Sequence, residues 1–163
     1  MLSVLTEKLA EAHGLAIASS TVAAKLVDLI PEPKLVAELE QMQAEADQTR
    51  QRCLEVERTF GQELAAEMLA HANSTSKRGA DLLGAWFKAG TDPLRAWTFL
   101  AMGEAGEVAA WLVVNELAGW HPHDEVCELA AWALPVQQRH LRLALEGTLA
   151  LAAAVEPAAA RWG

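Results

Sequence analysis

The feature that most constrains the fold of this chain is a seven-residue repeat of apolar and small side chains between residues 35 and 60. Successive members are four and three residues apart in alternation, and they are Leu35, Leu39, Met42, Ala46, Thr49, Cys53, Val56 and Phe60. This spacing keeps one face of an α-helix turned toward a neighbouring helix. The segment is therefore predicted to form a long helix of a bundle. Its small and polar members lie at mid-length, where they leave room for another group or for a bulky side chain from a neighbouring helix.

The composition agrees with an all-α protein of one domain over residues 1–163. Hydrophobic residues make up 52% of the chain, and tyrosine is absent. Alanine, leucine, glutamate and glutamine are abundant, and these residues favour helices over strands. A chain of this length can bury a sizeable core as a single unit.

Apolar periodicity and helix-breaking residues divide the chain into four long helices with unequal connections. The predicted helices cover residues 2–30, 33–60, 93–118 and 124–155, and the tail 156–163 is expected to be frayed. Residues 61–90 are predicted to hold two short helices on either side of the polar turn 73–76. Short links join the first helix to the second and the third to the fourth, which predicts two antiparallel hairpins. The chain is therefore predicted to be a ferritin-like four-helix bundle with one long crossover that contains short helices.

Charge and targeting signals argue against several classes of partner. The formal net charge is −9 and the 13 lysine and arginine residues are spread along the sequence, so neither nucleic acid nor an anionic membrane surface is an expected partner. The N-terminal segment carries charges in its first turns and does not resemble a signal peptide. Cys53 and Cys127 fall in helical patterns and form no metal or disulfide motif. A cytoplasmic location is therefore predicted.

Two acidic residues interrupt the third long helix, which is otherwise strongly apolar. At about 100° per residue, its buried face is predicted to hold Trp97, Leu100, Glu104, Val108, Trp111 and Asn115. Glu104 then lies at the centre of this face, where an unpaired carboxylate is costly. Glu107 lies about 60° to one side, so a buried and a solvated position both remain open for it.

The last predicted helix provides a partner for these acids. Gln137 and His140 are three residues apart and are expected on one helix face, as Glu104 and Glu107 are. Glu45 flanks the narrow middle of the seven-residue repeat. The sequence therefore predicts a metal site at mid-bundle, with the candidate ligands Glu45, Glu104, Glu107 and His140. Carboxylates with an imidazole suit iron or manganese and also accept zinc.

The same residues also permit a bundle that holds no metal. A buried glutamate can pair with a histidine or an arginine and coordinate nothing. The other histidines are expected at the surface or at its boundary, and these are His13, His71, His121 and His123.

Two stretches of the sequence resemble the YciF-type ferritin-like proteins. Residues 90–147, GTDPLRAWTFLAMGEAGEVAAWLVVNELAGWHPHDEVCELAAWALPVQQRHLRLALEG, resemble the second half of that family, in which an Asp-rich turn precedes a helix with a Glu-His-x-Glu-Ile-Ala run. Residues 45–61, EADQTRQRCLEVERTFG, resemble its second helix. The resemblance implies a ferritin-like fold, a carboxylate-bridged dimetal site at the centre of the bundle, and a homodimer.

Compared with the family motif, the chain keeps some ligand positions and lacks others. Glu104 and Glu107 match the two acids of the third long helix, and His140 keeps a ligand position in the last helix. Glu45 stands where the family has a histidine. Four further positions carry residues other than the acids and the histidine of the family, namely Ala16, Gln48, Ala105 and Gln137.

Three functions are compatible with these residues. The first is a ferritin-like, stress-related protein that keeps a smaller metal site, with one iron or manganese ion held by the four candidate ligands. The second is a metal-free pseudo-enzyme that acts as a dimeric interaction module. The third is a di-iron oxidase or ferroxidase in which other acids, such as Glu11 or Asp47, complete the site. The missing ligands argue against an enzyme, and a homodimer and a protein partner are expected.

Overall fold

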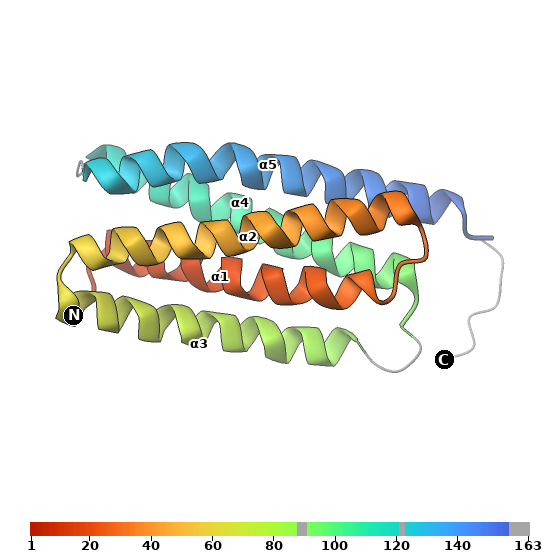
Figure 1. The fold of residues 1–163 in the computed structure, drawn as a ribbon, viewed down its shortest axis with the longest axis horizontal. Coiled ribbons are helices and arrows are strands. Elements are labelled where there is room, and N and C mark those ends of the chain that lie inside the picture. Colours follow the sequence, from red (N-terminus) through yellow and green to blue (C-terminus); the bar gives the residue numbers. More distant parts are fainter. Residues whose placement is uncertain (88–90, 121–122, 157–163) are drawn as a thin grey trace.

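A computed structural model of the chain describes residues 1–87, 91–120 and 123–156, and within these ranges the secondary structure is entirely helical (Figure 1). The helices are α1 (Val4–Val27), α2 (Pro33–Thr59), α3 (Gln62–Trp86), α4 (Pro93–Trp120) and α5 (Asp124–Ala153). The all-α prediction is confirmed for this part of the chain. Residues 157–163 of the tail that was expected to fray lie outside the described residues, as does His121.

The helices run side by side, with α1 in contact with α2, α3 and α4 (Figure 1). The α5 helix packs on α4 and α2, and α3 packs on α1 and α2. Hydrogen bonds join His13 to Glu57 and Ser20 to Asp47, so α1 and α2 are antiparallel. The α4 and α5 helices are also antiparallel, because Trp97 contacts Ala144 and Glu104 faces His140. Both predicted hairpins are therefore confirmed.

The prediction of two short helices within residues 61–90 is wrong, because α3 is one continuous helix. The polar run 73–76 does not break it. Serine, threonine and asparagine each cost only a few tenths of a kcal/mol within a helix, and packing on α1 outweighs that cost. Thr75 is buried against α1, and the Arg78 guanidinium donates a hydrogen bond of 2.9 Å to the Thr75 hydroxyl.

Local signals set the ends of several helices. The α1 helix starts with a capping box between Ser3 and Thr6, and Pro33 is the first residue of α2. The Asp92 carboxylate caps α4 by accepting a hydrogen bond of 2.9 Å from the backbone N–H of Arg95. Asp124 is the first helical residue of α5 and places a negative charge in its first turn.

The buried face of α4 differs from the prediction in two places. Its buried members are Ala96, Trp97, Leu100, Ala101, Glu104, Glu107, Trp111, Val114 and Ala118. Val108 is only half-buried and Asn115 is exposed, whereas Glu107 is buried. The large members are three and four residues apart in alternation, as they are in α2. A straight helix has 3.6 residues per turn, so a buried face that repeats every 3.5 residues rotates away from the face of a straight helix by about 20° every seven residues. The prediction assumed a straight helix, and this is why it placed Val108 and Asn115 on the buried face.

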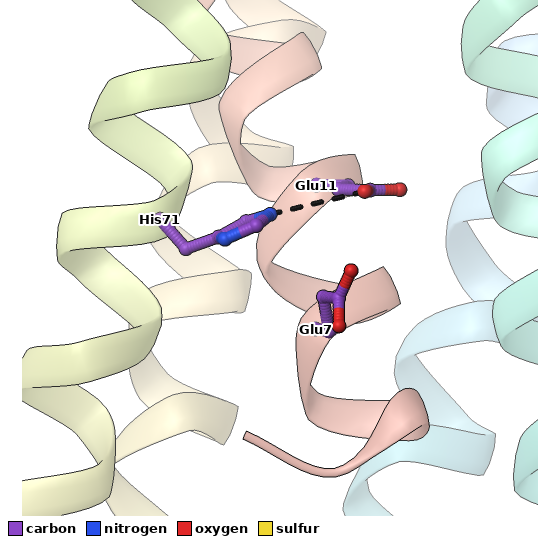
Figure 2. A group of neighbouring side chains, drawn as sticks. All are labelled: Glu7, Glu11 and His71. Carbon is purple, nitrogen blue, oxygen red and sulfur yellow. Dashed lines mark ion pairs between the residues drawn. The ribbon is translucent and has the colours of Figure 1, made fainter. Parts of the chain in front are cut away.

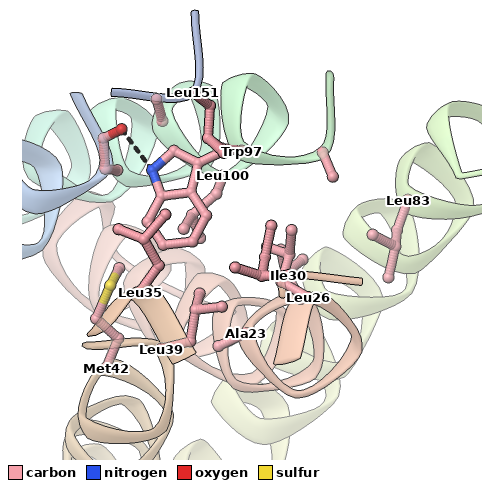
Figure 3. Packing of buried hydrophobic residues seen from close by; sticks show 14 residues of the cluster. Ala23, Leu26, Ile30, Leu35, Leu39, Met42, Leu83, Trp97, Leu100 and Leu151 are labelled. Atoms are coloured by element: carbon pink, nitrogen blue, oxygen red, sulfur yellow. Dashed lines mark hydrogen bonds between the residues drawn. The ribbon is translucent and has the colours of Figure 1, made fainter. Parts of the chain in front are cut away.

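Two apolar clusters fill the two ends of the bundle. One is built around Leu26, Leu39, Trp97 and Leu100 (Figure 3), where the Trp97 indole N–H donates a hydrogen bond of 2.7 Å to the Ala144 carbonyl. The other contains Leu9, Cys53, Trp111 and Leu129. Along each of α1, α2, α4 and α5, the section between these clusters carries buried polar side chains. We refer to them as the polar centre, and its members are Ser19, Thr49, Glu104, Glu107, Gln137 and His140.

By length and composition alone, α4 is apolar enough to cross a membrane, and 39% of its most apolar window is buried inside the bundle. Core helices of soluble proteins pass the same test. The polar centre contributes Glu104 and Glu107 to the buried face of this helix.

Candidate carboxylate and histidine centre

Glu104 and His140 face each other across the α4–α5 contact, and both side chains are only 1% exposed. The Ser19 hydroxyl of α1 donates a hydrogen bond of 2.9 Å to Glu104 Oε1. The other carboxylate oxygen, Glu104 Oε2, lies 3.6 Å from His140 Nδ1. That distance is too long for a hydrogen bond, and neither atom has a hydrogen-bond partner in the described chain.

Glu45 contacts the opposite side of the His140 ring. His140 Nε2 donates a hydrogen bond of 2.6 Å to Glu45 Oε2, and the Arg139 guanidinium binds the same oxygen. The Glu45 side chain is 21% exposed, so it lies at the outer edge of the polar centre. The imidazole therefore stands between two carboxylates, and the three groups do not converge on a single point.

Glu107 is buried, which settles the question that its position on α4 left open. The residue is 2% exposed, and its Oε2 atom has no hydrogen-bond partner in the described chain. Burial, followed by the nearby charge of Glu104, raises the pKa of the Glu107 carboxyl well above its ordinary value. The structure thus brings Glu104, Glu107 and His140 into one buried region and places Glu45 at its rim.

The histidine and its outer carboxylate are stabilised in their charged forms. Burial by itself lowers the pKa of His140, but Glu104 and Glu45 outweigh burial and hold this pKa above its ordinary value. Partial burial works to raise the pKa of Glu45, but the hydrogen bonds from His140 and Gln41 and the charge of Arg139 lower it overall. A cation that binds at His140 must therefore displace a proton from the ring.

Further polar atoms in this part of the bundle lack partners. Both side-chain polar atoms of Gln137, Oε1 and Nε2, are buried without a hydrogen bond to the described chain, and so is the indole Nε1 of Trp111. Buried polar atoms are rarely left unpaired in native proteins, and ordered water or an ion is a frequent partner. The interior is therefore polar enough to bind a small polar group.

His13 and Glu57 form a second buried pair, and the expectation that His13 lies at the surface or its boundary is wrong. The imidazole Nδ1 lies 2.8 Å from Glu57 Oε1, and both side chains are 1% exposed. Glu57 follows Cys53 by four residues and so continues the buried face of α2, where Val56 was predicted. His13 likewise follows Leu9 by four residues on the buried face of α1. Helical spacing was the signal that could have identified this pair.

The two cysteines are unpaired and lie in helices, as expected. Cys53 is fully buried, and burial, with smaller contributions from Glu57 and Glu107, raises the pKa of its thiol well above the ordinary value. A thiol with such a pKa is a poor nucleophile and a poor metal ligand at neutral pH. Cys127 is half-buried and makes a weak contact of 3.6 Å from its sulfur to the Ala118 carbonyl.

A separate group of possible metal ligands lies nearer the surface, between α1 and α3 (Figure 2). Ligand atoms of Glu7, Glu11 and His71 all lie within 4.8 Å of one another, and His71 Nε2 is 3.8 Å from Glu11 Oε1. His71 is 28% exposed, as its predicted boundary position requires. Lys8 already pairs with Glu11 at 2.7 Å, so a cation has to compete with an ammonium group for this site.

The other acids and histidines considered from the sequence lie away from the polar centre. Glu11 belongs to the group between α1 and α3, and exposed Asp47 accepts a hydrogen bond from Ser20. His123 is half-buried and its ring stacks on Phe60 with a centroid separation of 4.2 Å. Neither Glu11 nor Asp47 is therefore in place to complete a dimetal site.

The two acids of α4 should respond in opposite directions when each is replaced by glutamine in metal-free protein. Glu104→Gln removes the carboxylate that faces the His140 ring, so the free energy of unfolding at neutral pH should fall by about 1–3 kcal/mol. Glu107→Gln should raise it by about 1 kcal/mol, because an amide is not penalised for ionising in the interior.

The pH dependence of the free energy of unfolding tests whether Glu107→Gln stabilises the protein. The pKa of Glu107 is raised on folding, so the stability it contributes is fully present below the unfolded-state pKa of about 4.3 and is lost as the pH rises. The advantage of Glu107→Gln should therefore be absent near pH 4 and should grow toward pH 8. Urea unfolding in the presence of a chelator measures it, and equal losses of stability in both variants at neutral pH would contradict this account.

Comparisons of the chain with protein-family models, with curated proteins and with solved structures give no match.

Proposed function

We propose that this chain is a ferritin-like helical bundle that binds one divalent cation, iron or manganese, at Glu104, Glu107 and His140. The observation that carries the proposal is a set of buried ligand-type atoms that lack hydrogen-bond partners in the described chain, namely Glu104 Oε2, Glu107 Oε2 and His140 Nδ1. Two carboxylates and an imidazole form a donor set that suits these metals.

The separation of Glu104 Oε2 and His140 Nδ1 supports a shared ion. At 3.6 Å the two atoms are too far apart for a hydrogen bond, yet both can reach one cation through ligand bonds of about 2.0–2.2 Å. Glu107 is the proposed third ligand, and because the ligand atoms of Glu104, Glu107 and His140 do not all lie within 4.8 Å of one another in the structure, metal binding requires these side chains to move closer together. A cation also offsets the repulsion between the two buried acids, which adds to the effect of burial in raising the pKa of Glu107.

Glu45 fits the role of a positioning residue better than that of a ligand. Metal-bound histidines commonly donate the other ring N–H to a carboxylate, which fixes the tautomer and the ring orientation. His140 donates from Nε2 to Glu45, and this leaves Nδ1 directed toward Glu104. Ser19 holds the remaining oxygen of Glu104 in a similar way.

The ferritin-like topology is supported by the helix directions. Glu11 lies beside His71, and Ala18 lies beside Gly79, so α3 runs parallel to α1. The α4 helix is antiparallel to α1, since Leu26 shares one apolar cluster with Trp97 and Leu9 shares the other with Trp111. Because α2 is also antiparallel to α1, α2 and α4 run in the same direction. Two antiparallel hairpins joined by one full-length crossover have this arrangement.

Metal analysis of the purified protein tests the proposal. Protein produced with added iron or manganese is expected to carry about one ion per chain, measured by mass spectrometry of the elements. Glu104→Ala and His140→Ala should reduce the ion to background, and Glu45→Ala should weaken binding by about 10–100-fold. Circular dichroism establishes whether each variant keeps its helices.

A matched control separates the buried site from the group between α1 and α3. The double variant Glu11→Ala, His71→Ala removes two of the three ligands of that group and should retain the ion. Loss of the ion in this variant, with retention in Glu104→Ala, would assign the metal to the other group. An absence of metal in wild-type protein would overturn the proposal.

The charges of the polar centre favour a second candidate, a metal-free bundle that acts as a dimeric interaction module. Arg139 and His140 both contact Glu45, and His140 also faces Glu104, so cationic and anionic groups alternate without an added ion. Apolar side chains remain exposed on α4 and α5, where a second subunit can pack, and they are Leu112, Val113, Leu145 and Leu149. A metal-free wild-type protein that sediments as a dimer supports this candidate.

A further inference from the structure

A cleft of about 210 Å³ opens between α1, α3 and α4 and extends to the polar centre. Leu82 of α3 and Met102 of α4 lie at its rim, and both are more than half exposed. The walls are apolar, and Ser19, Glu104 and Glu107 form the buried floor. The cleft therefore joins an open apolar entrance to two buried carboxyl groups.

Glycines shape this cleft at two points. Gly103 of α4 lines it, and no atom of the described chain lies within 4 Å of a Cβ atom built there, so the missing side chain leaves open space. A Cβ atom at Gly79 of α3 would lie 2.8 Å from the Ala18 methyl group, so α3 approaches α1 closely at that point. The cleft thus narrows between α1 and α3 and stays open along α4.

The floor carries carboxyl oxygens that accept no hydrogen bond from the described chain. Glu107 Oε2 and Glu104 Oε2 are buried and have no hydrogen-bond partner in the described chain. Among the described residues, no lysine, arginine or histidine lines the cleft, and His140 faces Glu104 from outside it. A ligand that fills it must therefore pair an apolar body with a polar end that donates hydrogen bonds.

We infer that this cleft binds a small apolar primary amine, with its hydrocarbon body against the walls and its ammonium group at Glu107 and Glu104. Ammonium–carboxylate hydrogen bonds are among the strongest in an apolar setting. A cavity of about 150 Å³ lined by apolar residues binds benzene, so this somewhat larger cleft suits an amine the size of 2-phenylethylamine. The inference concerns the metal-free chain and does not depend on a bound cation.

Three probes of similar size and different charge test the chemistry of the floor. They are 2-phenylethylamine, 2-phenylethanol and 3-phenylpropanoate, titrated by calorimetry or by NMR into protein treated with a chelator. The amine should bind at least about tenfold more tightly than the alcohol, and the carboxylate should not bind. Equal affinities for all three probes would overturn the inference.

Two variants on the same helix test the location. Gly103→Leu should fill the cleft and reduce amine affinity by about tenfold or more, whereas Gly106→Leu should leave it unchanged. Gly106 is a suitable control because it is also exposed on α4, has open space around a built Cβ, and does not line the cleft. Equal affinity in both variants would place the amine elsewhere and reject the cleft.

Glu107→Gln tests the role of the carboxyl group separately from the space. The variant should lose most of the preference for the amine over the alcohol and should still bind the alcohol. An unchanged preference would assign no role to Glu107 and would overturn the inference. Since chelator is present throughout, failure of these titrations leaves the metal proposal intact, and absence of metal leaves the amine site intact.

Discussion

Glu57→Ala is expected to lower the free energy of unfolding by about 2–4 kcal/mol, because it leaves a buried imidazole without its hydrogen-bond partner and a cavity where the side chain was. Glu57 and His13 are each 1% exposed, and their hydrogen bond of 2.8 Å ties α2 to α1. Without the carboxylate, neither ring nitrogen of the buried His13 has a hydrogen-bond partner in the described chain, since Nε2 already lacks one. Equilibrium unfolding in urea measures the loss.

Two further variants establish that burial causes this effect. Glu55→Ala removes an exposed acid from the same helix, which accepts a hydrogen bond of 3.1 Å from Gln51, and should change stability by less than about 0.5 kcal/mol. Replacing both His13 and Glu57 by leucine should recover much of the loss, since apolar replacements leave no buried polar group without a hydrogen-bond partner. A loss for Glu57→Ala no larger than that for Glu55→Ala would contradict the buried pair.

Gly14→Ala is expected to destabilise the protein by about 2–3 kcal/mol, although alanine normally favours a helix over glycine by about 1 kcal/mol. A Cβ atom at Gly14 would lie 2.4 Å from the Ala72 carbonyl oxygen and 2.6 Å from the Thr75 Cβ. The first of these contacts is to backbone, which cannot move aside as a flexible side chain does. The α3 helix must therefore shift away from α1.

Gly106→Ala provides the matched control for this prediction. Gly106 is also helical, but no atom of the described residues lies within 4 Å of a Cβ built there, so alanine should stabilise the protein by up to about 1 kcal/mol. Gly14→Ala should lower the melting temperature by roughly 4–12 °C, and Gly106→Ala should raise it slightly. Stabilisation by both changes would show that the α1–α3 contact is looser than the structure indicates.

The sequence predicted the long helices well because their signals are local. Pro33 and Asp92 mark helix starts without reference to the rest of the fold, and both act there in the structure. The sequence does not predict the single helix within residues 61–90, because the polar run 73–76 has weak helix propensity and is typical of a turn. Contacts of Thr75 with α1, distant in sequence, keep this segment helical.

The candidate site was predicted only in part, because local spacing identifies the buried faces but not the contacts between helices. Periodicity placed Glu104 and His140 on buried faces, and the structure confirms both positions. It did not decide the side on which Glu107 lies, because a 3.5-residue repeat and a straight helix diverge along α4. It also missed the pairing of His13 with Glu57, which depends on the register between α1 and α2.

By itself, the sequence determined that this protein is helical and that at least one carboxylate of the apolar helix α4 faces inward. Spacing along one helix fixes which side chains share a face, and hydrophobic burial fixes which face turns inward. Only the tertiary structure decided which groups meet. The contact of His140 with Glu45, the packing of α3 on Gly14 and the cleft that reaches Glu107 each join residues from different helices. Such contacts depend on the register and approach of packed helices, which no single helix encodes.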